Sequence, residues 1–431
     1  MLKKLSILMW GMAAAVLGGC HASRLASASG EIKNPVMHKN TEESLVPPYV
    51  LPDVLLSRTG KKIDNAFDWV HIRRPELLEL YKKEMYGYLP PRPATTEYET
   101  LSVKEDALNN TAIRKEIKLT FRMNGKKHSF VMLLYIPKNL SAPAPVFVGL
   151  NFRGNHTVTP EKDVIMTGKD VDGNFVEKRR SKHINRFHIE ETIKRGFASA
   201  TVSYHDIYPD NKDENSWRKS VYNLFFAGES NEEFHAHASA LSAWAWGMSR
   251  MLDCLESEKM IDCSNAFVHG LSRLGKAALW AGANDTRFKL VISNESGCCG
   301  AALARRDFGE TVEIITHYFP HWFVSSFKKY ARNEDKLPFD QHCLAALIAP
   351  RYLAIGSAQE DLHADPYGEF LSGAHAGAVY KLFGIDTYTV DTPRIVGSHI
   401  TGAVSYHIRS GVHDQNLDDW MRYWDIAAKI K

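Results

Sequence analysis

V-H-G-L-S-R-L-G-K, residues 268–276, joins two kinds of sequence pattern. The residues that lead into it, N-A-F-V-H-G (265–270), predict a buried strand, and K-A-A-L-W-A (276–281) predicts a helix. A strand, a sharp turn and a helix in this order form a nucleophile elbow, in which Gly270 leaves space for the turn and Ser272 is exposed at its tip. The pattern G-x-S-x-x-G is weak on its own, because a small serine also suits an ordinary strand-to-helix turn.

Apolar runs rich in β-branched residues alternate with helical segments through the rest of the chain. They predict strands at 127–137, 144–152, 197–204, 288–294 and 351–357, and helices at 237–255 and 275–283. Alternating strands and helices build a mostly parallel sheet that is covered by helices on both faces. Together with the elbow, the pattern predicts an α/β-hydrolase fold, a three-layer sandwich with a mostly parallel central sheet.

A serine elbow predicts that an acid and then a histidine follow along the chain. His413 lies in H-I-R-S-G-V-H-D, in a loop before a predicted terminal helix at 418–429. Two acids come directly after predicted strands, Glu295 in V-I-S-N-E-S-G and Asp361 in I-G-S-A-Q-E-D. Serine, acid and histidine in this order predict acyl transfer by a serine nucleophile, with the choice between the two acids left open.

The first twenty residues have the order of an export signal. Two lysines precede an apolar run at 5–17, and Gly-Gly-Cys20 follows it. The ending L-G-G-C resembles a bacterial lipobox, so we expect Cys20 to be lipidated and the protein to be an exported lipoprotein, periplasmic or on the outer membrane of a Gram-negative bacterium. An ordinary cleaved signal with a chance cysteine is the alternative. Residues 21–45 read as a polar tether, and residues 46–431 are expected to form one catalytic domain.

The charge balance and the cysteines exclude several classes of function. The chain has 53 basic and 50 acidic side chains, a net charge of +3, and the two lysines of the signal account for 2 of these charges. This near balance favours neither nucleic acid nor an anionic surface as a partner, so membrane contact is expected only through Cys20. Six cysteines minus the lipid anchor leave five, so at least one thiol is unpaired within the chain. Zinc-type spacings of cysteine and histidine are missing, and we expect no metal and no organic cofactor.

The segment G-L-S-R-L-G-K resembles the G-x-S-R-x-G-K signature of the glucuronoyl esterases, carbohydrate esterase family 15. The resemblance continues in order along essentially the whole domain, through N-E-S-G-C-C-G-A-A-L-A-R-R, F-G-E-T-V, F-P-H-W-F, L-P-F-D-Q-H, A-D-P-Y-G-E-F and G-V-H-D. It implies an α/β-hydrolase that cleaves the ester between (4-O-methyl-)glucuronic acid on xylan and a lignin alcohol. A glucuronoxylan or lignin-carbohydrate ester is then the substrate, and the enzyme is expected to be a monomer.

The resemblance also implies roles for the residues that match the family motifs. Ser272 matches the nucleophile, His413 the general base and Arg273 the arginine that stabilises the oxyanion. Glu295 matches the acid of the fungal triad, and Asp361 matches the acid that many bacterial members keep at the usual hydrolase position.

Two carboxylates near one imidazolium attract it but repel each other, so we expect one of them to be partly protonated or paired elsewhere, for example with Arg305 or Arg306. We expect Glu295 to be the principal partner of His413 and Asp361 to be auxiliary.

Three further residues match positions that bind the sugar. Lys276 and Glu310 match residues that contact the hydroxyls or carboxylate of the uronate. His363 stands in D-L-H-A-D-P, where the family typically has a tryptophan, which leaves the sugar contact at this position open. The loop N-F-R-G-N-H (151–156) resembles the family's loop near the oxyanion site.

Two other functions are compatible with parts of this pattern. An acetyl xylan or feruloyl esterase would use the same catalytic machinery on another ester. A non-catalytic, glycan-binding lipoprotein would need only the scaffold, but a binding protein has no reason to keep serine, acid and histidine in triad order.

Overall fold

A mixed sheet of ten strands runs through the computed structural model, which describes residues 39–169 and 173–430. The strands are β1 (Thr95–Asp106), β2 (Ala112–Met123), β3 (Lys126–Pro137), β4 (Ala144–Asn151), β5 (Ala198–Ser203), β6 (Ile261–Leu271), β7 (Phe288–Asn294), β8 (Tyr352–Ala358), β9 (His399–Ile400) and β10 (Val404–Arg409). The α-helices of the described residues are α1 (Ala66–Asp68), α2 (Arg74–Tyr81), α3 (Ala107–Asn110), α4 (Ile184–Phe187), α5 (Ile189–Lys194), α6 (Tyr204–Ile207), α7 (Asn231–His237), α8 (Ala240–Leu255), α9 (Arg273–Asn284), α10 (Val312–Tyr318), α11 (Gln341–Ala346), α12 (Pro366–Lys381) and α13 (Leu417–Ile430).

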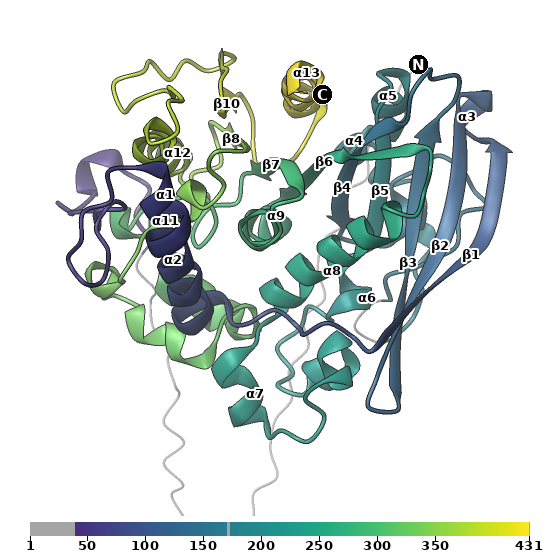
Figure 1. The fold of residues 1–431 in the computed structure, drawn as a ribbon, viewed down its shortest axis with the longest axis horizontal. Coiled ribbons are helices and arrows are strands. Elements are labelled where there is room, and N and C mark those ends of the chain that lie inside the picture. The colour runs from purple at the N-terminus through teal and green to yellow at the C-terminus, as the bar shows by residue number, and fades with distance from the viewer. Residues whose placement is uncertain (1–38, 170–172, 431) are drawn as a thin grey trace, which may run out of the picture. The chain divides into compact units, whose positions relative to one another are not determined.

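The sheet order is β1-β2-β3-β5-β4-β6-β7-β8-β10-β9, with β1 to β3 at one end and β8 and β10 toward the other (Figure 1). Neighbours from β5 through β4, β6, β7 and β8 to β10 are parallel, whereas β1, β2, β3 and β9 pair antiparallel. The mostly parallel sheet that the sequence predicts is therefore confirmed. Its parallel strands end at one edge, which brings together the loops that follow them.

Helices cover both faces of the sheet because side chains alternate along each strand. On β4, Val146 and Val148 belong to the core that α8 and α9 cover. Phe147, between them, packs in a second core with Trp420 and Trp424 of α13. These two cores give the three-layer arrangement that the sequence predicts.

The sequence pattern did not predict strands β1, β2, β9 and β10. Strand β1 is exposed along most of its length, so its sequence T-T-E-Y-E-T-L-S-V-K-E-D lacks an apolar run. Strand β10 is buried, but its polar residues Ser405, His407 and Arg409 are buried with it. A buried strand with polar side chains does not give the apolar signal by which buried strands are detected.

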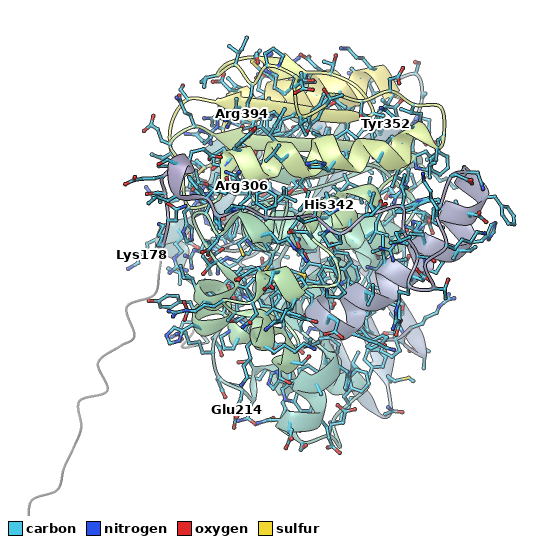
Figure 2. The ribbon with its side chains drawn as sticks, turned by 90° about the vertical axis from the view of Figure 1, so that its left-hand side faces the viewer. Lys178, Glu214, Arg306, His342, Tyr352 and Arg394 are labelled. Carbon is cyan, nitrogen blue, oxygen red and sulfur yellow. The ribbon has the colours of Figure 1, made fainter. Side chains whose placement is uncertain are left out.

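The packed domain begins earlier than residue 46. Asn40 is buried, and its carbonyl accepts a hydrogen bond from the backbone N–H of Gly309 at 2.7 Å. Glu43 forms an ion pair with Arg306 at 2.7 Å, on the face shown in Figure 2. The end of the expected tether is therefore docked on the domain. The rest of the tether and Cys20 lie outside the described residues.

Within residues 39–169 and 173–430, none of the helices combines the length and apolar character that crossing a membrane requires. The five cysteines of this part of the chain are all free thiols: Cys254, Cys263, Cys298, Cys299 and Cys343. The prediction of at least one unpaired thiol is confirmed.

Candidate active site

Ser272 occupies a strained turn between β6 and α9. Its φ of 59° lies in the left-handed region, which a non-glycine residue adopts only where the surroundings impose it. Its N–H donates to the carbonyl of Asn294 at 2.8 Å, which ties the turn to the end of β7. A Cβ atom at Gly270 would lie 2.1 Å from the carbonyl oxygen of Leu274, so only glycine fits there. The turn has the geometry of the predicted nucleophile elbow.

The other triad candidates lie at the same edge of the sheet. Glu295 follows β7, Asp361 follows β8 by a short turn, and His413 follows β10. Backbone bonds join the strand ends, as in the 2.7 Å bond from the N–H of Glu295 to the carbonyl of Gly356. Parallel strands thus bring together four side chains that are far apart in sequence, including Ser272.

Both acids contact the same nitrogen of His413. The Nδ1 atom of His413 lies 2.5 Å from Asp361 Oδ2 and 3.2 Å from Glu295 Oε2. Burial disfavours the imidazolium, but the hydrogen bonds and charges of Asp361 and Glu295 outweigh it and raise the pKa of His413 to about 9. The shorter bond belongs to Asp361, whereas the sequence analysis predicts Glu295 as the principal partner.

The pKa values of the two acids also favour Asp361 as the ionised partner of His413. Burial favours the neutral form of Asp361, but the hydrogen bond and charge of His413 hold its pKa below the usual value. Burial raises the pKa of Glu295 to about 7, against the opposing effects of His413 and Arg409. Asp361 is thus the acid that stays ionised at neutral pH, as a triad requires.

The arginine that pairs with Glu295 is Arg409, whose Nη2 lies 2.6 Å from Glu295 Oε1. The expectation that Arg305 or Arg306 pairs with a triad acid is wrong. Arg305 pairs with Asp340 at 3.2 Å, and Arg306 Nε lies 2.8 Å from a carboxylate oxygen at the start of α12. Arg409 ends β10, so it reaches the same sheet edge as the triad and meets Glu295 there across 114 positions of the chain.

Arg273, the first residue of α9, follows the serine directly. Its Nη1 lies 2.5 Å from Asp210 Oδ2, and its guanidinium carbon lies 4.6 Å from the ring centre of Trp322 and 5.1 Å from that of Phe319. A carboxylate and two aromatic faces therefore hold the cation beside Ser272. A fixed cation at this position can stabilise negative charge that develops on a carbonyl oxygen.

Asp210 holds the arginine and was missed by the sequence analysis. It also accepts hydrogen bonds from the Tyr204 hydroxyl (2.8 Å), His321 Nε2 (2.7 Å) and Trp322 Nε1 (2.7 Å). Burial disfavours the carboxylate, but these donors and Arg273 hold the pKa of Asp210 well below its usual range. It is one of several acids that follow the predicted strand at 197–204, so the sequence did not single it out.

Lys276, Glu310 and His363 form one polar cluster near Ser272. The Nζ atom of Lys276 donates to the carbonyl of Ser296 and lies 3.8 Å from Glu310 Oε2. His363 Nε2 lies 3.4 Å from Glu310 Oε1, and half of the His363 side chain is exposed. Burial disfavours ionisation of Glu310, but His363 and Lys276 hold its pKa below the usual value. The predicted substrate-binding residues are thus brought together, with Lys276 one helical turn from the serine.

Most of the motif residues in the 151–156 loop are buried and hold the loop in place, and few of them are exposed. Asn151 is buried, and its side-chain oxygen accepts a hydrogen bond from the N–H of Gly154 at 2.7 Å. His156 is also buried, with Nε2 at 3.2 Å from the carbonyl of Val176. Arg153 is exposed, so of the three residues in the motif it is the one that can meet a ligand.

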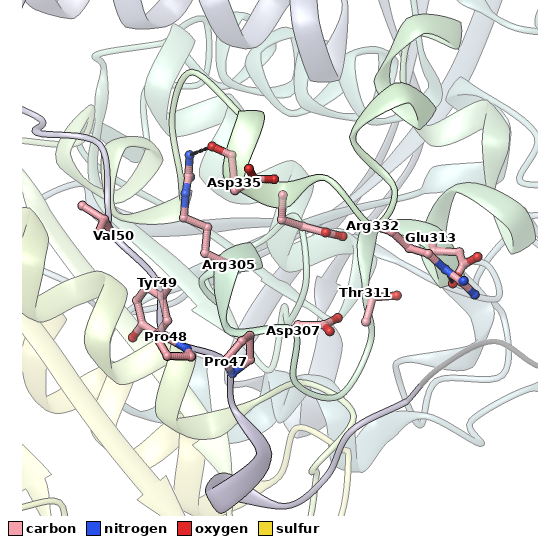
Figure 3. A pocket seen from close by; sticks show the side chains of 11 residues that line it. Pro47, Pro48, Tyr49, Val50, Arg305, Asp307, Thr311, Glu313, Arg332 and Asp335 are labelled. Carbon is pink, nitrogen blue, oxygen red and sulfur yellow. Dashed lines mark hydrogen bonds and ion pairs between the residues drawn. The ribbon is translucent and has the colours of Figure 1, made fainter.

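A cavity of about 830 Å³ lies away from the triad, between the N-terminal segment and two later loops (Figure 3). Its walls are formed by Pro47, Pro48, Tyr49, Val50, Arg305, Asp307, Thr311, Glu313, Arg332, Glu334 and Asp335. Ser272 and His413 are not part of this cavity. The side chain of His413 is 42% exposed, which indicates an open catalytic edge and not an enclosed pocket.

Among the described residues, the groups that could share a metal ion are Glu295, Asp361 and His413. Two ligands of one tetrahedral ion, each about 2.0–2.2 Å from it, lie roughly 3.4 Å apart. The 2.5 Å between His413 Nδ1 and Asp361 Oδ2 is shorter and fits a shared proton. The cluster therefore suits a catalytic triad better than a metal centre.

Comparison with known proteins gives the family of this chain. The model of a family described as "Glucuronyl esterase, fungi" matches residues 183–384. The solved structure of a glucuronoyl esterase from Solibacter usitatus is 40% identical, with a TM-score of 0.84, and the match covers 89% of this chain and 99% of that one. A carbohydrate esterase, MZ0003, from an unknown prokaryotic organism is 39% identical over 398 residues, 90% of this chain and 91% of its own.

A 4-O-methyl-glucuronoyl methylesterase from Podospora anserina is 28% identical over 334 residues, which cover 75% of this chain and 58% of that protein. The α/β-hydrolase fold, the elbow and the relatives that match nearly full length all agree. The chain belongs to the glucuronoyl esterases, carbohydrate esterase family 15.

Proposed function

We propose that this protein is a serine-type esterase that hydrolyses esters of glucuronic acid, releasing the uronic acid and an alcohol. The observation that carries the proposal is that the catalytic candidates all lie at one edge of the sheet. A strained Ser272 lies beside a held cation, Arg273, and His413 is hydrogen-bonded to carboxylates at the neighbouring strand ends. This arrangement fits ester hydrolysis by nucleophilic catalysis.

The acylation step assigns one task to each group. The Nδ1–H of His413 is donated to Asp361, which leaves Nε2 as the base that takes the Ser272 proton. The serine oxygen attacks the ester carbonyl, and the oxyanion that forms is stabilised by Arg273 and backbone N–H groups of the elbow. His413 then gives its proton to the leaving alcohol, and the uronate remains esterified to Ser272.

Deacylation repeats these roles with water as the nucleophile. His413 takes a proton from water as it attacks the acyl-enzyme, and returns that proton to Ser272 as the bond to the serine breaks. Throughout both steps Asp361 keeps the imidazole in one tautomer and stabilises the imidazolium.

The cluster of Lys276, Glu310 and His363 supplies recognition of the sugar. A buried ammonium and an ionised carboxylate, 3.8 Å apart, offer hydroxyl groups a donor and an acceptor side by side. The half-exposed imidazole of His363 adds a polar contact at the rim, where a tryptophan would offer a stacking face. This chemistry favours a polyhydroxylated acyl group over the small acyl group of an acetyl ester.

We extend the proposal to a polymeric substrate, the ester of (4-O-methyl-)glucuronic acid on xylan with a lignin alcohol. The open catalytic edge supports it, because a branched polymer cannot enter an enclosed pocket. We also propose that the protein acts as a monomer and is exported and anchored through a lipid on Cys20, as the order of its first twenty residues predicts.

The decisive experiment compares the wild type with Ser272→Ala on benzyl glucuronate, with acetylated xylan and methyl ferulate alongside. Since the sugar site and the oxyanion site remain in the variant, we expect it to bind glucuronate but to lose about four decades of kcat. Turnover within about tenfold of the wild type would overturn the mechanism. Preference for acetylated xylan or methyl ferulate would identify an acetyl xylan or feruloyl esterase instead, and no turnover of any ester would favour a glycan-binding protein.

A further inference from the structure

Arg409 is a buried arginine with an unusually complete set of partners. It ends β10, four residues before His413, and is 5% exposed. Its guanidinium donates hydrogen bonds to five acceptors: Asp419 Oδ2 (2.9 Å), the carbonyls of Ser410 (3.0 Å), Val412 (3.2 Å) and Asp414 (2.6 Å), and Glu295 Oε1 (2.6 Å).

Two of these acceptors are the carbonyls on either side of His413. The guanidinium therefore fixes the backbone before and after the catalytic base. Other side chains also hold this loop: Asn294 Nδ2 donates to the carbonyl of Asp414 at 3.0 Å, and Arg186 Nε lies 2.6 Å from Asp414 Oδ1. On its outer side the backbone of Gly411 bonds to that of Glu360 at 3.0 Å. Among the described residues, Arg409 is the side chain that binds the carbonyls on both sides of the base.

The guanidinium also acts on the second acid. Glu295 Oε1 accepts from Arg409, and Glu295 Oε2 accepts from the N–H of Asp414 at 3.0 Å and lies 3.2 Å from His413 Nδ1. A continuous chain of contacts thus runs from the arginine through the carboxylate to the imidazole. Arg409 lowers the pKa of Glu295, which burial raises.

We propose that Arg409 is a positioning residue of the esterase reaction, which acts on His413 through the flanking backbone carbonyls and through Glu295. The proposal rests on the function proposed above. Arginine suits the task because its planar group presents five donors in a fixed fork, whereas lysine has three donors on a flexible stem. Arg409→Lys therefore keeps the charge and loses the geometry.

The chain offers a matched control in Arg305. This arginine is 7% exposed and is also bound to a carboxylate, Asp340, and to backbone carbonyls, those of Asp335, Leu337 and Phe339. Arg305 is thus also a buried arginine that holds a loop through backbone carbonyls, but its loop does not carry the catalytic base. Loss of stability alone will affect both arginines, and loss of positioning will affect Arg409 alone.

The test measures kcat, KM and thermal unfolding of Arg409→Lys, Arg409→Met, Arg305→Lys and Arg305→Met on benzyl glucuronate, at a temperature where each variant is folded. We expect the Arg409 variants to lose about ten- to a hundredfold in kcat with KM within about threefold, and the Arg305 variants to keep kcat within about threefold. The lysine variant keeps the test valid if Arg409→Met does not fold.

A double-mutant cycle tests the route. If Arg409 acts partly through Glu295, the cost in kcat of Arg409→Met combined with Glu295→Gln will be smaller than the product of the single costs. Equal losses of kcat at Arg409 and Arg305, a change in KM alone, or fully multiplicative costs would each overturn the proposal. Wild-type protein without activity on glucuronate esters would instead refute the proposed function, and the same variants would then be compared on whichever ester the wild type hydrolyses.

Discussion

The imidazole of His413 and the carboxylate of Asp361 are joined by a hydrogen bond of 2.5 Å, and they come from the loops after the neighbouring parallel strands β10 and β8. The second carboxylate, Glu295, lies 3.2 Å from the same nitrogen but is also bound to Arg409 and to the N–H of Asp414. Asp361 is therefore the main partner of the histidine. Glu295 is shared between the histidine and the loop that carries the histidine.

This difference predicts the order of effects when each acid is removed. We expect Asp361→Ala to lower kcat by about two to three decades, since the imidazolium loses its closest ionised partner. Glu295→Ala will cost less, and the double variant will cost more than the product of the two single losses, because each carboxylate partly covers for the other. The measurement is kcat on benzyl glucuronate. A larger loss for Glu295→Ala would restore the interpretation drawn from the sequence alone.

The raised pKa of His413 predicts the pH dependence. The base works in its neutral form, and its pKa is raised to about 9, so kcat/KM will rise with pH and level off above about pH 9. Asp361→Asn removes a charge that stabilises the imidazolium, so it will move this rise to lower pH. The profile is measured on benzyl glucuronate, with Ser272→Ala as the blank for spontaneous hydrolysis. An unchanged midpoint in Asp361→Asn would contradict the assignment.

Asp210 is predicted to act through Arg273. Asp210→Asn keeps the size of the side chain but removes the charge that holds the guanidinium at 2.5 Å, so we expect about a ten- to hundredfold loss of kcat with little change in KM. Tyr204→Phe is the control, since it removes one donor to Asp210 and leaves the carboxylate; its kcat should stay within about threefold. Equal effects of both substitutions would mean that packing, and not the charge, is responsible.

The proposed anchor makes a prediction about location. Cys20→Ser removes the sulfur that a lipid would be attached to, so the protein should move from the membrane fraction to the soluble exported fraction with unchanged activity. Fractionation of expressing cells followed by the ester assay measures both. A wild type found entirely in the soluble fraction would show that the cysteine is not lipidated.

The apolar strands and the elbow could be predicted because their signals are local. Strand β7 is buried except at Lys289, which is partly buried, and the turn at Ser272 has its glycines within three residues on each side. His413 could be placed as well, since the order of a triad and a loop before the last helix restrict where it can lie.

The residues that hold the catalytic groups could not be predicted in this way. Arg273 meets Asp210 across 63 positions, and Arg409 meets Glu295 across 114. Such pairs are created by the strand order and leave no periodic trace in the sequence. The shorter contact of Asp361 with His413 could not be foreseen for the same reason, because the cation that binds Glu295 lies on β10, a strand whose polar residues hid it from the apolar pattern.

Asn40 is docked beside the loop that carries Glu310, since its carbonyl accepts a hydrogen bond from the N–H of Gly309. If Cys20 is fixed in a membrane, twenty residues separate the lipid from this docking point, and a fully extended chain of that length spans at most about 70 Å. The domain would then stay within about that distance of the lipid surface, and the substrates that it meets would be those that reach this zone.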